Sequence, residues 1–176
     1  IIETSNLNSY NYSILSEIMN KNNVGVRLEI NMVKKGYFQE FSSGEKLFSK
    51  INYISIPFLL HYYLLDNKQS VYINLGPYLE YLLKVNSQNI PSSINASEVY
   101  FFDEKTDSKL GYGLKLSIGL STLMKMNKIQ LDFSYMYNFS NLISPDYKSD
   151  LVPDVSNFNT LSISLVYLFN FTKNEI

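Results

Sequence analysis

Apolar and polar residues alternate with a period of two over most of the chain. In residues 24–32, 110–120, 129–139 and 161–171, every second residue is Val, Leu, Ile, Met, Phe or Tyr. The less regular segments 10–19, 51–65 and 71–84 also have one face that is apolar or nearly so. Successive side chains of a β-strand point to opposite faces, so this pattern predicts seven β-strands.

The lengths of these segments and of their connections favour a membrane protein. Most are about 10 to 14 residues long, whereas soluble strands are usually about 5 to 6 and a tilted transmembrane strand needs about 9 to 11. Short connections at 20–23, 66–69 and 125–127 alternate with long polar ones at about 37–50, 85–107 and 141–157. Short periplasmic turns and long outer loops are typical of outer-membrane barrels. We therefore predict an all-β protein, a transmembrane antiparallel up-and-down β-barrel in the bacterial outer membrane, with residues 1–176 as one domain.

The predicted topology implies a further strand. If the short turns are periplasmic, the segment 10–19 descends from outside and the last strand ends in the periplasm. Bacterial single-chain barrels have an even number of strands. We therefore expect eight strands, with the first upstream of Ile1 and the domain N-terminally incomplete.

Side-chain size indicates which face contacts lipid. The polar face of 110–120 is Gly, Gly, Lys, Ser and Gly, which suits a narrow lumen, whereas the apolar face is too bulky to fill the interior of an eight-stranded barrel. Aromatic residues then form two interface girdles on the lipid face, although β propensity alone could also explain them. The girdle residues are Tyr62, Tyr135, Tyr137, Phe139, Tyr167 and Phe169.

Composition excludes several classes of function. Fifteen Lys and Arg against 16 Asp and Glu give a net charge of -1, which argues against nucleic-acid binding. The chain has no Cys, so disulfides, thiol nucleophiles and Cys-based zinc sites are excluded. It also lacks any run of about 18 apolar residues that would form a transmembrane helix. No metal-ligand spacing or phosphate-binding loop occurs, and we expect no cofactor.

Short motifs carry a resemblance to a known family. They are the segment 53–63 (YISIPFLLHYY), the LGPY sequence at 75–78, the VYLF sequence at 166–169, an acidic residue at Glu29 and a Lys35-Gly36 turn signal. Together they resemble the small porin-like outer-membrane β-barrels of Bacteroidota. Ser55 and His61 replace an acidic residue and a Lys that are common in that family, so the resemblance does not carry a lumen ion pair over to these two positions.

Seven polar residues are predicted to face the lumen as a network: Glu17, Arg27, Glu29, His61, Glu80, Lys115 and Asp132. Ionisable groups inside a membrane protein can form a proton path or substrate site. Mutual pairing in a filled lumen is the favoured interpretation, because desolvated charges must be paired. Lys115 is expected to pair with Glu80 or Asp132, whose strands flank its own.

His61 is the one histidine and the one candidate for imidazole catalysis on lipid. Its position near a short turn places it toward the periplasm, far from the outer leaflet. We expect it to form hydrogen bonds in the lumen, and we predict no catalytic residue.

Two prolines interrupt the predicted strands. Pro lacks the N–H that a β-ladder requires. A hairpin centred between Asn67 and Lys68 places Pro57 opposite Tyr78 and Pro77 opposite Phe58. We predict a break in the ladder there, with Gly76 pointing inward.

The sequence thus predicts a non-enzymatic integral outer-membrane barrel that acts as a structural or interaction subunit. Its expected partners are outer-membrane lipids and other outer-membrane proteins of a larger assembly, such as secretion or insertion machinery. An outer-membrane lipid-modifying enzyme is the alternative, and a soluble ligand-carrying barrel is a third hypothesis.

Overall fold

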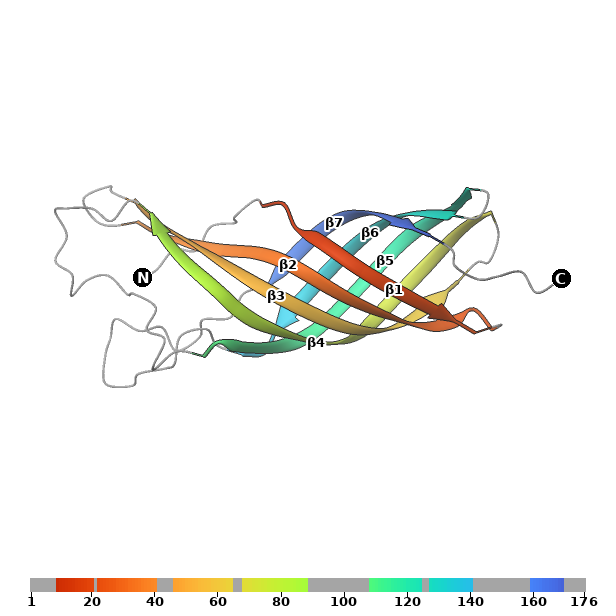
Figure 1. The fold of residues 1–176 in the computed structure, drawn as a ribbon, viewed down its shortest axis with the longest axis horizontal. Helices are drawn as coiled ribbons and strands as arrows, with labels where there is room; N and C mark the ends of the chain where they lie inside the picture. Colours follow the sequence, from red (N-terminus) through yellow and green to blue (C-terminus); the bar gives the residue numbers. More distant parts are fainter. Residues whose placement is uncertain are drawn as a thin grey trace.

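A computed structural model describes residues 9–20, 22–40, 46–64, 68–88, 108–124, 127–140 and 159–169. They form one antiparallel sheet in which the strands follow their order in the chain (Figure 1). No helix in this part of the chain is long and apolar enough to cross a membrane. The strands are β1 (Tyr12–Met19), β2 (Val24–Glu40), β3 (Lys46–Tyr63), β4 (Gln69–Gln88), β5 (Leu110–Met124), β6 (Asn127–Asn138) and β7 (Thr160–Leu168).

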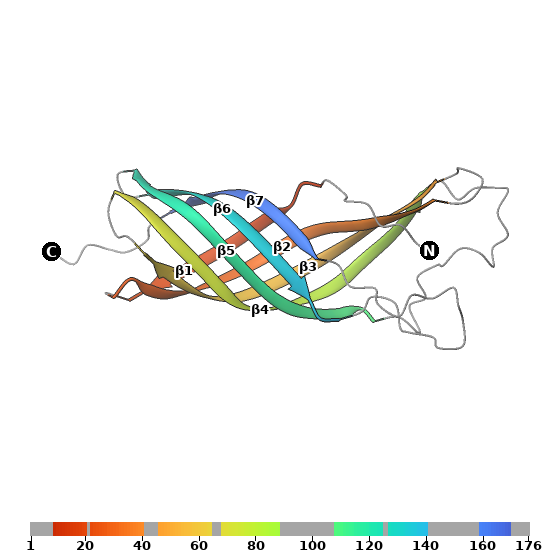
Figure 2. The same cartoon turned by 180° about the vertical axis from the view of Figure 1, so that it is seen from behind.

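The sheet is strongly curled, as the two opposite views in Figures 1 and 2 show. Each strand pairs with its sequence neighbours, and within the described residues β1 and β7 each pair on one side only. The all-β, up-and-down architecture predicted from the sequence is confirmed. The eighth strand stays a prediction.

All predicted strands are present, but several are longer than the sequence pattern indicated. β2 continues to Glu40 and β3 begins at Lys46, so the predicted long loop at 37–50 is wrong. Lys35 and Gly36, interpreted as a turn signal, pair with Ile51 and Lys50 inside the sheet. The inward and outward alternation of the side chains continues past Met32, because Val33 and Lys35 are both buried and Lys34 between them is exposed. Residues 89–107 and 141–157 of the other two predicted long loops lie outside the described residues.

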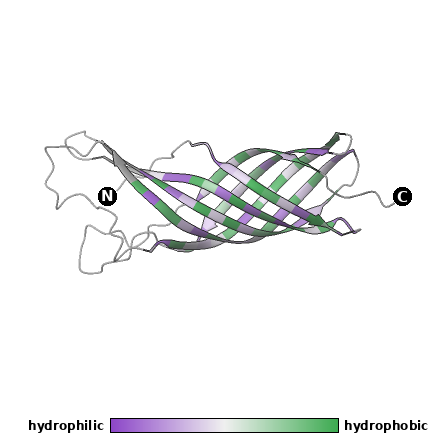
Figure 3. Ribbon diagram, in the orientation of Figure 1, coloured by the Kyte–Doolittle hydropathy of each residue, from purple (hydrophilic) through white to green (hydrophobic). Residues whose placement is uncertain are grey.

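Hydrophobic and hydrophilic residues alternate along the strands (Figure 3). On β5, Leu114 and Leu116 are exposed on the outward, convex face, whereas Lys115 and Ser117 are buried on the concave face. Asp132 of β6 is buried on the same concave face. These side chains point as the period-two pattern predicts.

Glycines on β5 make room on the concave face for larger residues of β4. Gly111, Gly113 and Gly119 pair with Glu80, Tyr78 and Tyr72, respectively. A Cβ atom on Gly113 would lie 2.7 Å from Tyr78 Oη, and one on Gly111 would lie 2.7 Å from Glu80 Cγ. The glycines of β5 therefore leave space on the concave face that side chains of the neighbouring strand β4 occupy.

The two prolines fall where the hairpin register predicts. Pro57 pairs with Tyr78 and Leu60 pairs with Leu75, but the ladder between these two pairs is interrupted. Gly76 is buried on the concave face, where a Cβ atom would overlap the carbonyl oxygen of Phe58. The predicted break is confirmed, and it coincides with a close approach of two backbones.

Candidate functional site

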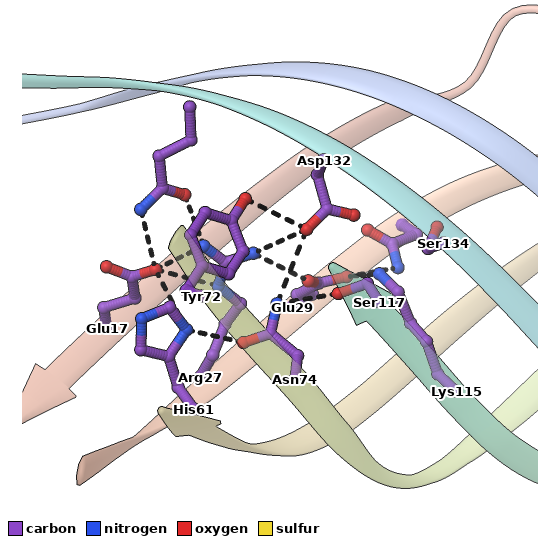
Figure 4. A network of polar contacts seen from close by, with 12 residues as sticks. Glu17, Arg27, Glu29, His61, Tyr72, Asn74, Lys115, Ser117, Asp132 and Ser134 are labelled. Carbon is purple, nitrogen blue, oxygen red and sulfur yellow. Dashed lines mark hydrogen bonds and ion pairs between the residues drawn. The ribbon is translucent and has the colours of Figure 1, made fainter. Parts of the chain in front are cut away.

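The candidate site is a group of polar side chains on the concave face, shown in Figure 4. We call it the central cluster, and its members come from β1, β2, β3, β4, β5 and β6. Their alternation with outward apolar residues directs them all into the curl of the sheet. The members are Glu17, Arg27, Glu29, His61, Tyr72, Asn74, Lys115, Ser117, Gln130 and Asp132.

Arg27 connects most of the central cluster. Its Nε donates to Glu17 Oε1 at 2.9 Å, and Nη2 also donates to Glu17 and to Gln130 Oε1. On the other side of the guanidinium, Nη1 lies 3.4 Å from Asp132 Oδ2. With 1% of its surface exposed, Arg27 depends on these carboxylates to compensate its lost hydration.

Glu29 joins Arg27 to Lys115. Its Oε1 lies 3.8 Å from Arg27 Nη1, and its Oε2 accepts a hydrogen bond of 2.6 Å from Lys115 Nζ. Asn31 Nδ2 donates to the same Oε2 at 3.1 Å. Both oxygens of this buried carboxylate therefore face donors or cations.

Asp132 and His61 are connected through Asn74. Asn74 Nδ2 donates to Ser117 Oγ at 2.8 Å and lies 3.4 Å from Asp132 Oδ2, while Tyr72 donates its hydroxyl to the same oxygen at 3.1 Å. His61 Nδ1 lies 2.5 Å from Asn74 Oδ1 and 3.7 Å from Glu17 Oε1. The imidazole is thus held by an amide and a carboxylate on the concave face.

A second, smaller group lies farther toward the ends of the strands that carry the long connections. Lys35 Nζ donates to both oxygens of Glu80, at 2.9 and 2.7 Å, and Asn138 Nδ2 donates to Glu80 Oε1 at 2.6 Å. We call Lys35, Glu80 and Asn138 the outer cluster. Glu80 is buried on the concave face as predicted, and the hydrogen bonds of its carboxylate among the described residues join it to Lys35 and Asn138.

The predicted partner of Lys115, Glu80 or Asp132, is wrong, because Lys115 pairs with Glu29. Lys115 pairs with Gly76 of β4 and Met136 of β6, whereas Glu80 lies opposite Gly111 and Asp132 opposite Gly119. Each carboxylate is therefore about four residues, or about 13 Å, along the strand from Lys115. The curl of the sheet instead brings Glu29 of β2 across the concave face to meet it.

His61 is enclosed by protein. Its side chain has no exposed surface, and its ring contacts Tyr63 and Tyr72 at centroid distances of 4.6 and 5.0 Å. Nε2 is buried and has no hydrogen-bond partner among the described residues. A ring in this position faces the interior of the curl and does not reach the outward surface.

Apolar side chains fill the concave face next to the outer cluster. Val33, Ile51, Tyr53 and Leu82 are each buried there. The three strands that carry them, β2, β3 and β4, extend beyond the described start of β5 at Leu110. The interior toward the long-connection end therefore combines these apolar side chains with the ion pair of the outer cluster.

The predicted girdle residues all point outward. The ring centroids of Tyr137 and Phe139 lie 5.2 Å apart toward one end of the sheet. Those of Tyr167 and Phe169 lie 4.8 Å apart toward the other end. Tyr62 and Tyr135 are exposed on the same convex face. Contact of these rings with a lipid interface stays a prediction.

Sequence reasoning missed several members of the two clusters. Three of them, Gln130, Asn74 and Tyr72, occupy inward-facing positions of strands that the sequence predicts. Counting alternate residues along those strands is therefore enough to identify them as inward-facing. Lys35 was missed because the strand was predicted to end before it. No group of three or more His, Cys, Asp or Glu residues in the described part of the chain is arranged to hold a metal ion.

Comparison with known proteins identifies the family. No curated protein and no solved structure matches the chain. Residues 3–144, most of the chain, match the family model described as outer membrane protein beta-barrel domain. Together with the curled, up-and-down antiparallel sheet, this match shows that the chain belongs to the outer-membrane β-barrel domain family and is located in the bacterial outer membrane.

Proposed function

We propose that this protein is a non-enzymatic barrel that serves as a structural or interaction subunit of a larger outer-membrane assembly, such as secretion or insertion machinery. The observation that carries the proposal is the engagement of the charged groups on the concave face with one another. Arg27, Lys115 and Lys35 each contact at least one carboxylate. The charged side chains of the interior thus pair with one another. We therefore assign contacts with other molecules to the outward face and the outer end.

The same packing argues against a transport channel. Porins enclose water with roughly 16 to 18 strands, whereas a sheet of about eight strands leaves an interior just wide enough for side chains. Val33, Ile51 and Leu82 are buried apolar side chains on the concave face near the outer end, which supports a filled interior. The proposal also places the chain among the porin-like barrels of Bacteroidota, because the motifs around Pro57 and Pro77 resemble those of that family.

The packing also gives no support to lipid modification. Such an enzyme must bring its general base to the ester or amide of a lipid within hydrogen-bond reach. His61 is fully buried and faces the concave side, away from the convex surface. Its role in the proposal is to hold Asn74 and Glu17 in place.

The experiment is a crosslinking scan on the full-length protein in its native outer membrane. A photo-crosslinking residue placed at outward positions such as Leu79, Ile118 or Ile163 is expected to capture one protein partner at a fixed ratio, in a complex that survives mild detergent. The buried neighbour Ser117 serves as the matched control for Ile118 and is expected to capture nothing.

Two outcomes would overturn the proposal. One is a protein that remains monomeric in mild detergent and crosslinks to lipid alone from every outward position. The other is a change in membrane lipid structure that depends on the protein and is lost in His61→Ala. Stepwise conductance in planar bilayers would likewise contradict the closed interior.

A further inference from the structure

A β-bulge on β4 changes the direction of one lysine. The register between β3 and β4 shifts between Asn52 and Tyr53, because Asn52 pairs with Lys84 whereas Tyr53 pairs with Leu82. Leu83 is the extra residue, and it is exposed, while Leu82 on the concave face is buried. Without the bulge, Lys84 would have the inward parity of Leu82; with it, Lys84 is exposed on the convex face.

The bulge places Lys84 in line with two other lysines. Lys34 pairs with Asn52, and Asn52 pairs with Lys84, so the three residues form one row across β2, β3 and β4. Lys50 lies two residues from Asn52 on the same outward face. Neighbouring strands are about 4.8 Å apart and residues rise about 3.3 Å, so the three lysines lie within about 10 Å of one another at backbone level.

This lysine triad, Lys34, Lys50 and Lys84, lies where the apolar convex surface ends. The adjacent outward row consists of Tyr12, Met32, Ile54, Tyr81 and Leu110. The triad is on the side of the long connections, which face outward from the cell in this kind of barrel. The backbone of Lys34 is fixed there, because its N–H donates to Asn11 Oδ1 and its carbonyl accepts from Ser9 Oγ.

The positive charge is concentrated on one side of the molecule. All three lysines are exposed, and within the described residues none of them forms an ion pair. Toward the same end of the sheet, β5 and β6 instead present aromatic residues on the outward face: Tyr112 of β5, Tyr137 of β6 and Phe139 just after β6. A cluster of lysines immediately beside an apolar and aromatic surface matches a ligand with both anionic groups and acyl chains.

We propose that the lysine triad binds the phosphate groups of a phosphorylated lipid in the outer leaflet, whose acyl chains lie along the adjoining apolar face. An acidic segment of a protein would pair with the lysines but would leave the neighbouring apolar side chains of Met32, Tyr81 and Leu83 without a contact. The inference rests on the proposed contact of the convex face with lipid, and it adds a specific lipid site on one side of the barrel.

The test measures lipid binding to the full-length protein by native mass spectrometry in detergent micelles, with diphosphoryl lipid A as the probe. The wild type is expected to retain this lipid more tightly than the same lipid after phosphatase treatment. Affinity should fall about fivefold for each Lys→Gln substitution at 34, 50 or 84. The triple Arg variant, which keeps the charge, should retain binding.

Lys68 is exposed and lies just before β4 begins, at the end of that strand opposite to Lys84. Lys68→Gln is therefore the matched control for each single variant and should leave binding unchanged. Equal binding of wild type and the triple Gln variant would overturn the proposal, as would equal affinity for the two forms of the lipid. If the triple variant does not fold, wild-type affinity in all three single variants would overturn it as well. Failure of the wild type to insert into phosphatidylcholine vesicles would instead contradict the proposed lipid contact itself.

Discussion

The two faces of β5 show how one strand serves two environments. On the concave face it carries Gly, Lys and Ser, all buried, and Lys115 is held by Glu29. On the convex face it carries Leu, Ile and Tyr, and about half of the Leu116 surface is exposed. A soluble barrel would have the reverse arrangement, because water would be outside and the apolar core inside.

The concave and convex faces tolerate different residues. On the concave face, a charge is tolerated only when partners from other strands reach it, as Glu17, Gln130 and Asp132 reach Arg27. On the convex face, the contiguous apolar surface is far larger than monomeric soluble proteins expose, and it needs an apolar environment. Substitutions that exchange the properties of the two faces should therefore be the most damaging.

The largest effect is expected when a charge is removed from the concave face. Arg27→Met should destabilise the protein by about 3 to 5 kcal/mol, because Glu17 and Asp132 would remain buried without compensation. The measurement is urea unfolding in lipid vesicles, followed by the gel mobility of folded and unfolded protein. Lys68→Met, a charge loss at an exposed residue, is the control. An unfolding midpoint of Arg27→Met equal to that of the control would show that the central cluster is not needed.

A charge added to the convex face should cost somewhat less. Leu116→Arg is expected to destabilise by about 2 to 4 kcal/mol if the residue lies near the bilayer midplane. The folded yield in vesicles measures this, with Leu116→Met as the apolar control. Normal folding of the Arg variant would contradict the assignment of this face to lipid.

Overfilling the concave face should have an intermediate effect. Gly113→Val should cost about 1 to 3 kcal/mol, because even a Cβ atom there would overlap the carbonyl oxygen of Tyr137. Leu114→Val, on the opposite face of the same strand, should cost less. If both variants unfold at the same urea concentration, the concave face has spare room and the interior is not closed.

The smallest effect is expected at the edge of the sheet. Ser134 and Ser162 share a hydrogen bond of 2.7 Å between β6 and β7, and Ser162 is only half-buried. Ser162→Ala should destabilise by about 0.5 to 1 kcal/mol, since a partly hydrated hydrogen bond contributes little. Urea unfolding of Ser164→Ala gives the comparison, and a loss above about 2 kcal/mol at Ser162 would mean that this edge is covered in the membrane.

The strands, the faces of the strands and the register of the β3–β4 hairpin follow from the sequence alone. Alternation with a period of two placed Leu114 and Lys115 on opposite sides, and the short turn at 66–69 fixed the pairing of Pro57 with Tyr78. These features are local, because they depend on the two-residue repeat of a strand and on the geometry of a turn. The sequence pattern misses the end of β2 because the apolar Val33 faces inward and the polar Lys34 faces outward, which reverses the polarity pattern without interrupting the strand.

The pairing of the buried charges depends instead on how the whole sheet is folded. Lys115 bonds to Glu29, and Lys35 bonds to Glu80, although neither pair lies on adjacent strands. These contacts cross the concave face, so they depend on the curl and stagger of the whole sheet, which no single strand encodes. The bulge that turns Lys84 outward has the same origin: a one-residue register shift is set by the pairing with β3, and it reverses the face that simple alternation would assign.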